Sequence, residues 1–197
     1  MNLHAMIPWD NEANLGLAYN EAMRRLPDDD WAIFVDHDAM PTTGQWHRQF
    51  EEAARFLPDA GAIVAMTNRI AAPWQRTGDP VGNDYAAHRR HGAARAKLRT
   101  LLDITDTKGW GGVAFAVSKA AWRQVGGFAD GLGCVDHSLH FRLRDAGRRV
   151  WMHEGIFYYH WRHQGEPDPT SKFPKAVGCP CRGPETPPSV RIILPPC

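Results

Sequence analysis

The sequence predicts an α/β fold in which a sheet is flanked by helices, and three observations indicate it. Short apolar runs alternate with segments whose apolar residues recur at helical spacing, which is the pattern of an α/β domain. The sharpest apolar run is continuous, as in a strand buried on both faces of a sheet. The 197 residues, 43% of them hydrophobic, suffice for one globular domain with a sizeable core.

The first elements follow from local patterns. A buried strand is predicted at 3–9, where an apolar run ends in Pro8 and polar residues. A helix should begin at the N-cap Asn14 and stop before Pro27. The run 31–35 is then a central strand of a parallel sheet, because it is wholly apolar and flanked by helices.

The later elements alternate in the same way, except in the middle of the chain. Between 71 and 109 we predict a short helix at about 88–102 and no strand, because Pro, Gly and polar residues dominate. The other predicted elements are a helix at 45–56, a strand at 62–66, an apolar segment at 110–117, helices at 118–125 and 136–146, and an extended segment from 149.

A change of composition divides the chain. Residues 1–164 form the predicted domain, and from Gly165 the sequence turns to Pro, Gly and Cys, so we expect an irregular tail at 165–197. Cys179, Cys181 and Cys197 lack the two closely spaced pairs of a structural zinc site. Their uneven placement does not indicate a secreted disulfide framework either.

Charge and hydropathy exclude some classes. A net charge of +1 argues against a nucleic-acid or membrane-surface binder, which would carry a basic excess. No stretch approaches the ~20 apolar residues of a membrane span, and the first residues lack the pattern of a signal peptide. We therefore expect no transmembrane segment, no nucleic-acid partner and a cytoplasmic location.

The strongest chemical signal is Asp36-His37-Asp38, directly after the apolar run 31–35. Ligands of open α/β sheets bind outside the carboxyl ends of strands, and two carboxylates there can hold one hard cation. The alternative is a polar turn in which the aspartates cap backbone amides. By count alone the polar turn is the commoner case, and the apolar run before the triplet strengthens the interpretation as a cation site.

Two further residues extend this signal. Asp136 lies at or just before the first turn of a predicted helix, where an acid is either an N-cap or a positioned base. His160 lies in the histidine-rich run 158–163, and it could complete a metal site begun by Asp36 and Asp38.

Other candidates each have a structural alternative. The basic cluster Arg89, Arg90, Arg95, Lys97 and Arg99 is a phosphate clamp or, more in keeping with charge runs, a solvated helix face. Asn68-Arg69 follows the third predicted strand and therefore points at the rim of the same cleft. Tryptophans such as Trp110 stack on a sugar or pack in the core.

Taken together, the motifs resemble those of glycosyltransferase family 2 enzymes with the GT-A fold, in a compact version. The segments that carry the resemblance are 33–38, Gly126-Gly127-Phe128 followed by Val135-Asp136, Arg142-Leu143 with Ala146-Gly147, and Tyr159-His160. They occur in the family's order over about residues 3–163. The resemblance implies a GT-A-like, Rossmann-type mixed sheet flanked by helices.

The resemblance also implies roles for individual residues. Asp136 would be the general base of an inverting reaction. The cation would be Mn²⁺ or Mg²⁺, and the donor a nucleotide sugar, with UDP favoured. The implied ligands of the cation are Asp38, His160 and Asp36; the implied nucleotide or donor contacts are Pro8, Asp10, Asn20, Asp36 and His37; and the implied lining of the donor and acceptor cleft is Asn68, Arg69, Trp110, Gly111 and Gly112.

The function predicted from the sequence is therefore a metal-dependent, hexosyltransferase-like enzyme. It would move a sugar from a nucleotide-sugar donor to a saccharide or other hydroxyl acceptor. Two alternatives stay open: a metal-dependent hydrolase that uses the same Asp and His residues, and a catalytically weak nucleotide- or carbohydrate-binding module.

Overall fold

The protein folds as an eight-stranded mixed sheet flanked by helices, in a computed structural model that describes residues 1–70, 72–78, 82–161, 188 and 190–195. Seven strands follow the order β1-β2-β6-β4-β7-β5-β8, and β3 pairs with β7. The strands are β1 Leu3–Met6, β2 Trp31–Val35, β3 Ala39–Pro41, β4 Ala60–Thr67, β5 Thr100–Asp103, β6 Ala114–Ser118, β7 Arg149–His160 and β8 Val190–Ile193. The helices are α1 Leu15–Arg24, α2 Trp46–Phe56, α3 Tyr85–Arg95, α4 Lys119–Gln124 and α5 Val135–Asp145, with a 3₁₀ turn at Pro73–Gln75.

The predicted α/β class is confirmed, but the sheet is mixed around its central strand. β2 is parallel to β1 and antiparallel to β6, whereas the isolated run 31–35 had suggested a parallel sheet. β4 is parallel to β7. A strand buried on both faces is wholly apolar whatever the direction of its neighbours, so its composition alone does not reveal that direction.

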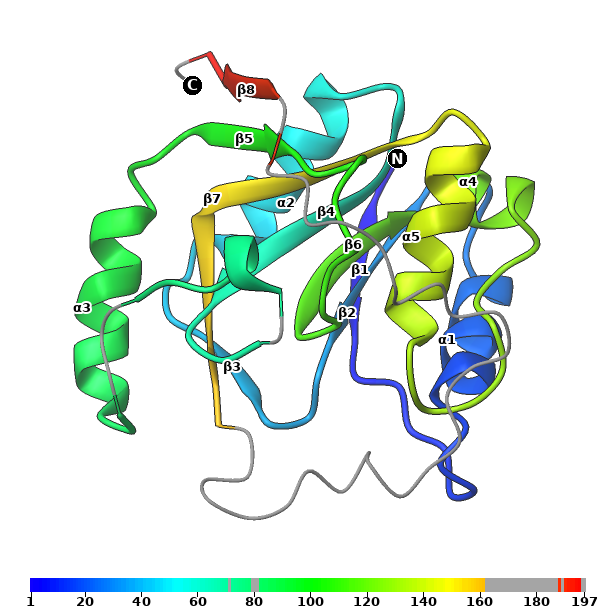
Figure 1. The fold of residues 1–197 in the computed structure, drawn as a ribbon, viewed down its shortest axis with the longest axis horizontal. Helices are drawn as coiled ribbons and strands as arrows, with labels where there is room; N and C mark the ends of the chain where they lie inside the picture. Colours follow the sequence, from blue (N-terminus) through cyan, green and yellow to red (C-terminus); the bar gives the residue numbers. More distant parts are fainter. Residues whose placement is uncertain (71, 79–81, 162–187, 189, 196–197) are drawn as a thin grey trace.

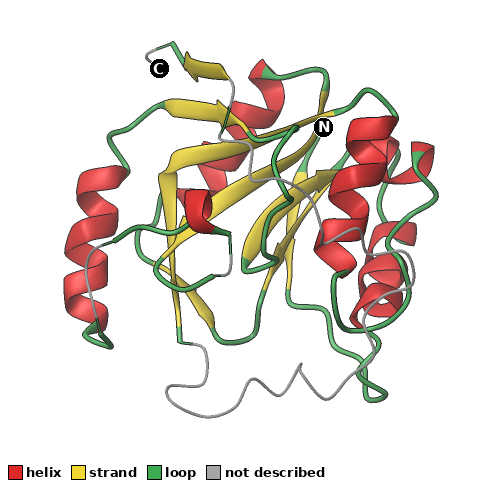
Figure 2. Cartoon of the chain, viewed as in Figure 1, coloured by secondary structure: helices red, strands yellow, loops and turns green. Residues whose placement is uncertain are grey.

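Helices cover both faces of the sheet (Figures 1 and 2). Side chains of β2 alternate, so that Phe34 joins the core cluster under α1, α4 and α5 while Ile33 joins the cluster under α2. Asn14 begins α1 as predicted, because its side chain accepts a hydrogen bond from the Leu17 N–H at 2.9 Å. α3 packs against β7 at the far side of the sheet.

A bend in β7 directs its last residues toward the end of β2. In the pairing of β4 with β7, Ala65 lies opposite His153, but the next residue, Met66, lies opposite Phe157. Three extra residues in β7 form this irregularity, and the strand turns sharply in Figure 1. Such bulges re-aim the chain that follows. As a result β3 pairs with the end of β7, with Ala39 opposite His160.

Three strands were not predicted. α3 ends at Arg95, and the last residues of the helix predicted at 88–102 belong to β5 instead. Leu101 of β5 pairs with His153, a long-range contact that local periodicity does not reveal. β3 is only three residues long. The predicted tail falls largely on residues outside the described ones, but its segment Val190–Ile193 forms β8 on the edge of the sheet.

Within the described ranges, the longest helices have 11 residues, and none is long and apolar enough to cross a membrane.

Candidate metal and nucleotide site

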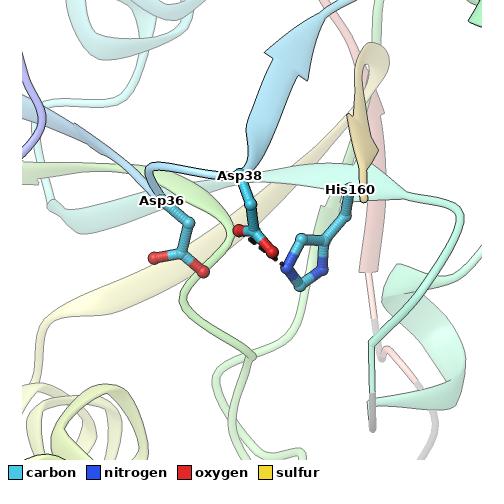
Figure 3. Close-up of side chains that lie close together, drawn as sticks. All are labelled: Asp36, Asp38 and His160. Carbon is cyan, nitrogen blue, oxygen red and sulfur yellow. Dashed lines mark ion pairs between the residues drawn. The ribbon is translucent and has the colours of Figure 1, made fainter. Parts of the chain in front are cut away.

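The ends of β2 and β7 bring Asp36, Asp38 and His160 together (Figure 3). One ligand atom from each side chain lies within 4.8 Å of the other two. Among the described residues this is the single cluster of three or more His, Cys, Asp or Glu side chains with that spacing. The contact between Asp38 Oδ1 and His160 Nε2 is 3.2 Å.

Hydrogen bonds hold His160 in one orientation. Its Nδ1 donates to the carbonyl oxygen of Arg69 at 2.8 Å, so Nε2 is the nitrogen that faces Asp38. The side chain of Asn68 accepts the backbone N–H of His160 at 2.8 Å and donates to its carbonyl oxygen at 3.4 Å. We call Asp38, Asn68, Arg69 and His160 the His160 frame.

Arg69 is itself held in place. Its guanidinium donates to the carbonyl oxygen of Trp161 at 2.8 Å and to Asn83 Oδ1 at 2.6 Å. The backbone N–H of Trp161 in turn donates to the carbonyl oxygen of Asp38 at 2.9 Å. The predicted cleft residues Asn68 and Arg69 therefore lie beside the cluster, and their contacts support His160.

The two aspartates have opposite electrostatic environments. The pKa of Asp36 is raised to about 7, mainly by burial; the charge of His160 opposes this rise, and the charges of Asp38 and Asp136 add to it. Burial also acts on Asp38, but the hydrogen bond and charge of His160 outweigh it and lower the pKa of that carboxyl. The same contact raises the pKa of His160 against the effect of its burial.

The cluster fits a divalent cation. A cation with ligand bonds of about 2.1 Å holds neighbouring ligands about 3 Å apart and opposite ligands about 4.2 Å apart. The 3.2 Å contact and the 4.8 Å limit require only small side-chain movements to reach such distances. The Nδ1 hydrogen bond to Arg69 leaves the Nε2 lone pair for a metal, as carbonyl oxygens commonly do for metal-bound histidines.

A cavity of about 280 Å³ lies on the other side of Asp36. We call it the β1 cavity, because the loop after β1 forms much of its wall. It brings together four of the residues implied as donor contacts, Pro8, Asp10, Asp36 and His37. It is lined by Pro8, Trp9, Asp10, Ala13, Leu15, Tyr19, Val35, Asp36, His37 and Leu132.

Two aromatic residues line this cavity, Trp9 and Tyr19, and neither was singled out as a contact residue from the sequence. The Trp9 side chain is 74% exposed, and its ring lies edge-on to His37 at 6.4 Å between centroids. Burial raises the pKa of the Tyr19 phenol, and the charges of Asp36 and Asp136 raise it further. The sequence places Trp9 at the end of the predicted strand 3–9, but β1 ends at Met6 and Trp9 lies in the loop beyond it, where an aromatic residue next to a strand end is a usable signal.

Asp136 lies in the first turn of α5, close to Asp36. Its Oδ1 accepts the backbone N–H of His137 at 2.8 Å and contacts the ring Nδ1 at 3.2 Å. These contacts outweigh the effect of burial and raise the pKa of His137. Its Oδ2 lies 3.4 Å from the place where a Cβ on Gly112 would stand. Asp136 is therefore not the N-cap of α5, which is Cys134: one of its oxygens binds the N–H of the next residue, and the other lies against the 110–112 loop.

Three residues implied for the site lie elsewhere or make other contacts. Asn20 is buried outside the β1 cavity, where Oδ1 accepts from Phe128 N and Trp122 Nε1 and Nδ2 donates to Phe128 O. The Trp110 side chain is fully buried against Phe115 and His140, so its ring cannot stack on a sugar. Both backbone polar groups of Gly111 are bound by the Gln75 amide.

Comparison with known proteins gives a likeness of fold. Neither known protein families nor curated proteins match the sequence. Among solved structures, the crystal structure of GalNAc-T7 with UDP, GalNAc and Mn²⁺ matches with a TM-score of 0.50 and 11% sequence identity. The fold is similar to a GT-A glycosyltransferase fold. The match covers 77% of this chain but only 31% of that one, and at this identity it bears on the fold alone.

Proposed function

We propose that this protein is a metal-dependent glycosyltransferase that moves a sugar from a nucleotide-sugar donor to a hydroxyl acceptor. The observation that carries the proposal is the cluster of Asp36, Asp38 and His160 next to the β1 cavity. A cation site beside a pocket of this size suits a nucleoside diphosphate, because the diphosphate binds the cation and the nucleoside enters the pocket. The fold similarity to a structure with UDP, GalNAc and Mn²⁺ supports the same kind of function.

In this proposal Asp36, Asp38 and His160 hold the cation. The mixed donor set favours Mn²⁺ over Mg²⁺, because Mg²⁺ prefers oxygen ligands in a strict octahedron whereas imidazole suits transition metals. When bound, the cation supplies positive charge that stabilises the leaving nucleoside diphosphate. Pro8, Asp10 and His37 contact the nucleotide, and the Trp9 indole offers an apolar face at the mouth of the cavity.

Asp136 is the proposed base. It acts on Asp36 electrostatically and therefore lies close to the cation cluster. A carboxylate there can accept the proton of the acceptor hydroxyl as it attacks the sugar, which gives inversion of configuration. The contacts with His137 orient Oδ1, and Oδ2 is the oxygen we assign to the acceptor.

Thermal unfolding with UDP, with and without Mn²⁺, tests the binding part of the proposal. A ligand that binds only the folded state raises its stability by about 2.7 kcal/mol at 100 times its Kd. We expect UDP to stabilise the protein only in the presence of Mn²⁺, and Asp38→Asn to abolish this effect. Asp59→Asn, a change in an exposed turn, is the matched control and should behave as the unchanged protein.

The same samples test the assignment of Asp136. Asp136→Asn should keep the Mn²⁺-dependent effect of UDP and lose turnover of a nucleotide sugar. Turnover that survives this change would remove Asp136 as the base. Absence of a joint UDP and Mn²⁺ effect in the unchanged protein would overturn the transferase proposal, and metal-dependent cleavage of a simple ester without nucleotide would favour a hydrolase.

A further inference from the structure

A second cavity, of about 460 Å³, lies between α3 and the segment after β3. We call it the α3 cavity. Two arginines from adjacent positions of α3, Arg89 and Arg90, line it together with Thr42 and Thr43. Successive side chains of a helix point about 100° apart, so two neighbours that line one cavity must stand on either side of it. The two arginine side chains therefore flank the same open space.

Close packing places α3 against β3. A Cβ on Gly92 would lie 1.9 Å from Thr42 Oγ1, so the helix can approach this closely only because residue 92 has no side chain. The Tyr85 hydroxyl also donates to the carbonyl oxygen of Pro41 at 2.8 Å. Two contacts, one near each end of α3, thus hold the arginines opposite Thr43.

The arginines are not used to hold the fold. Arg89 has no hydrogen-bond or ion-pair partner within the described part of the chain. Arg90 makes one contact, 3.8 Å to Asp84, between side chains that are 74% and 63% exposed, and such a surface pair contributes little. By contrast, Arg95 donates to Glu154 O and Arg99 to Glu52 Oε2. The four arginines of the predicted basic cluster therefore divide into two that bind other parts of the fold and two that line a cavity.

We propose that the α3 cavity binds a phosphate group carried by the acceptor substrate. Two guanidinium groups can each give paired hydrogen bonds to a phosphate, and the Thr43 hydroxyl adds a third donor. The placement as an acceptor contact rests on the proposed function. Asp38 and Thr42 flank β3 and are four residues apart, which is a separation of at most about 13 Å for an extended chain. A phosphorylated acceptor of that length would reach from the cation cluster to the α3 cavity.

Calorimetric titration in EDTA at low ionic strength tests this proposal with two probes, glucose 6-phosphate and inorganic phosphate. We expect saturable binding of glucose 6-phosphate to the unchanged protein and to Asp38→Asn, because neither the cation nor its ligands take part. The double change Arg89→Ala with Arg90→Ala should weaken this binding at least about tenfold, since each charged hydrogen bond contributes strongly. Arg24→Ala, at an exposed position of α1, is the matched control and should bind normally.

Each contrary outcome has its own meaning. No saturable binding, or equal binding by the double variant, would overturn the site. Inorganic phosphate that binds as tightly as glucose 6-phosphate would overturn its assignment to an acceptor. The double variant should also keep the Mn²⁺-dependent effect of UDP, and loss of that effect would assign the arginines to the donor diphosphate instead. Because the calorimetry uses no metal and no nucleotide, it stands or fails separately from the proposed function.

Discussion

The two sides of the Asp36, Asp38 and His160 cluster are built in different ways. On one side, the His160 frame is a set of hydrogen bonds among residues of β7 and the loops that follow β2 and β4. On the other side, the β1 cavity is lined mainly by apolar and aromatic side chains, and one of them, Trp9, is largely exposed. The difference indicates a division of labour, in which the frame sets the geometry of the cation and the cavity accommodates the nucleotide.

The test with the largest expected effect substitutes two histidines, one from the His160 frame and one from the β1 cavity. His160→Ala removes a proposed ligand, and we expect the affinity for Mn²⁺ to fall by more than about 100-fold, since even supporting hydrogen bonds contribute about 10- to 100-fold. His37→Ala keeps all three proposed ligands and removes a side chain that lines the β1 cavity, so Mn²⁺ affinity should change far less while UDP binding weakens. The electron paramagnetic resonance signal of free Mn²⁺ measures the Mn²⁺ affinity of each variant, and thermal unfolding with UDP and Mn²⁺ measures UDP binding. Equal losses in the two variants would break the comparison.

Low pH provides a second test, because burial lowers the pKa of two other histidines of the fold, whereas the pKa of His160 is raised. Burial lowers the pKa of His140 and of His153 to about 4, while their value in the unfolded chain is about 6.5. Between these values the unfolded chain binds protons that the folded protein excludes. Stability is therefore full above about pH 6.5 and falls with decreasing pH, by about 2 kcal/mol per histidine at pH 5.

Urea unfolding at pH 7, 6 and 5 measures this effect, with His140→Gln as the matched variant. The amide can still donate to the Thr105 carbonyl that His140 Nε2 contacts at 2.9 Å, but it does not titrate. The variant should lose about 2 kcal/mol less than the unchanged protein between pH 7 and pH 5. An identical loss in both proteins would show that His140 is not excluded from protonation by the fold. The Mn²⁺ titrations of the unchanged protein and its variants should therefore be carried out at pH 7 and above, where this loss of stability is absent.

How much of the site could be predicted from sequence depended on how local its causes are. Asp36 and Asp38 could be placed because the apolar run before them marks the end of a strand. The closeness of His160 to them was a hypothesis based on motif order, and the structure adds its cause, the irregular pairing of β4 with β7.

The residues that sequence reasoning misjudged depend on contacts between distant segments. Asn20 binds Phe128, and Trp110 packs on His140, so neither is available in the way that the resemblance implied. No local pattern distinguishes a tryptophan that stacks on a ligand from one that fills a core. β5 was missed for the same reason, since its hydrogen-bond partners in β7 lie far along the chain.

The prediction with the smallest expected effect tests whether the His160 frame supports Mn²⁺ binding by holding His160 in position. Asn68→Ala removes both hydrogen bonds to the backbone of His160, and we expect Mn²⁺ affinity to fall about tenfold, as for other groups that orient a metal ligand. It should also lower the free energy of unfolding by about 1–3 kcal/mol, because buried backbone groups lose their partners.

The matched control is Asn20→Ala, which removes an equally buried asparagine whose three hydrogen bonds go to Phe128 and Trp122, outside the β1 cavity. It should destabilise the fold by a similar amount without changing Mn²⁺ affinity. Affinity that follows stability in both variants would mean that Asn68 serves the fold alone. Affinity that falls only in Asn68→Ala, measured well below the unfolding temperature of each variant, would make Asn68 a positioning residue for the proposed ligand His160.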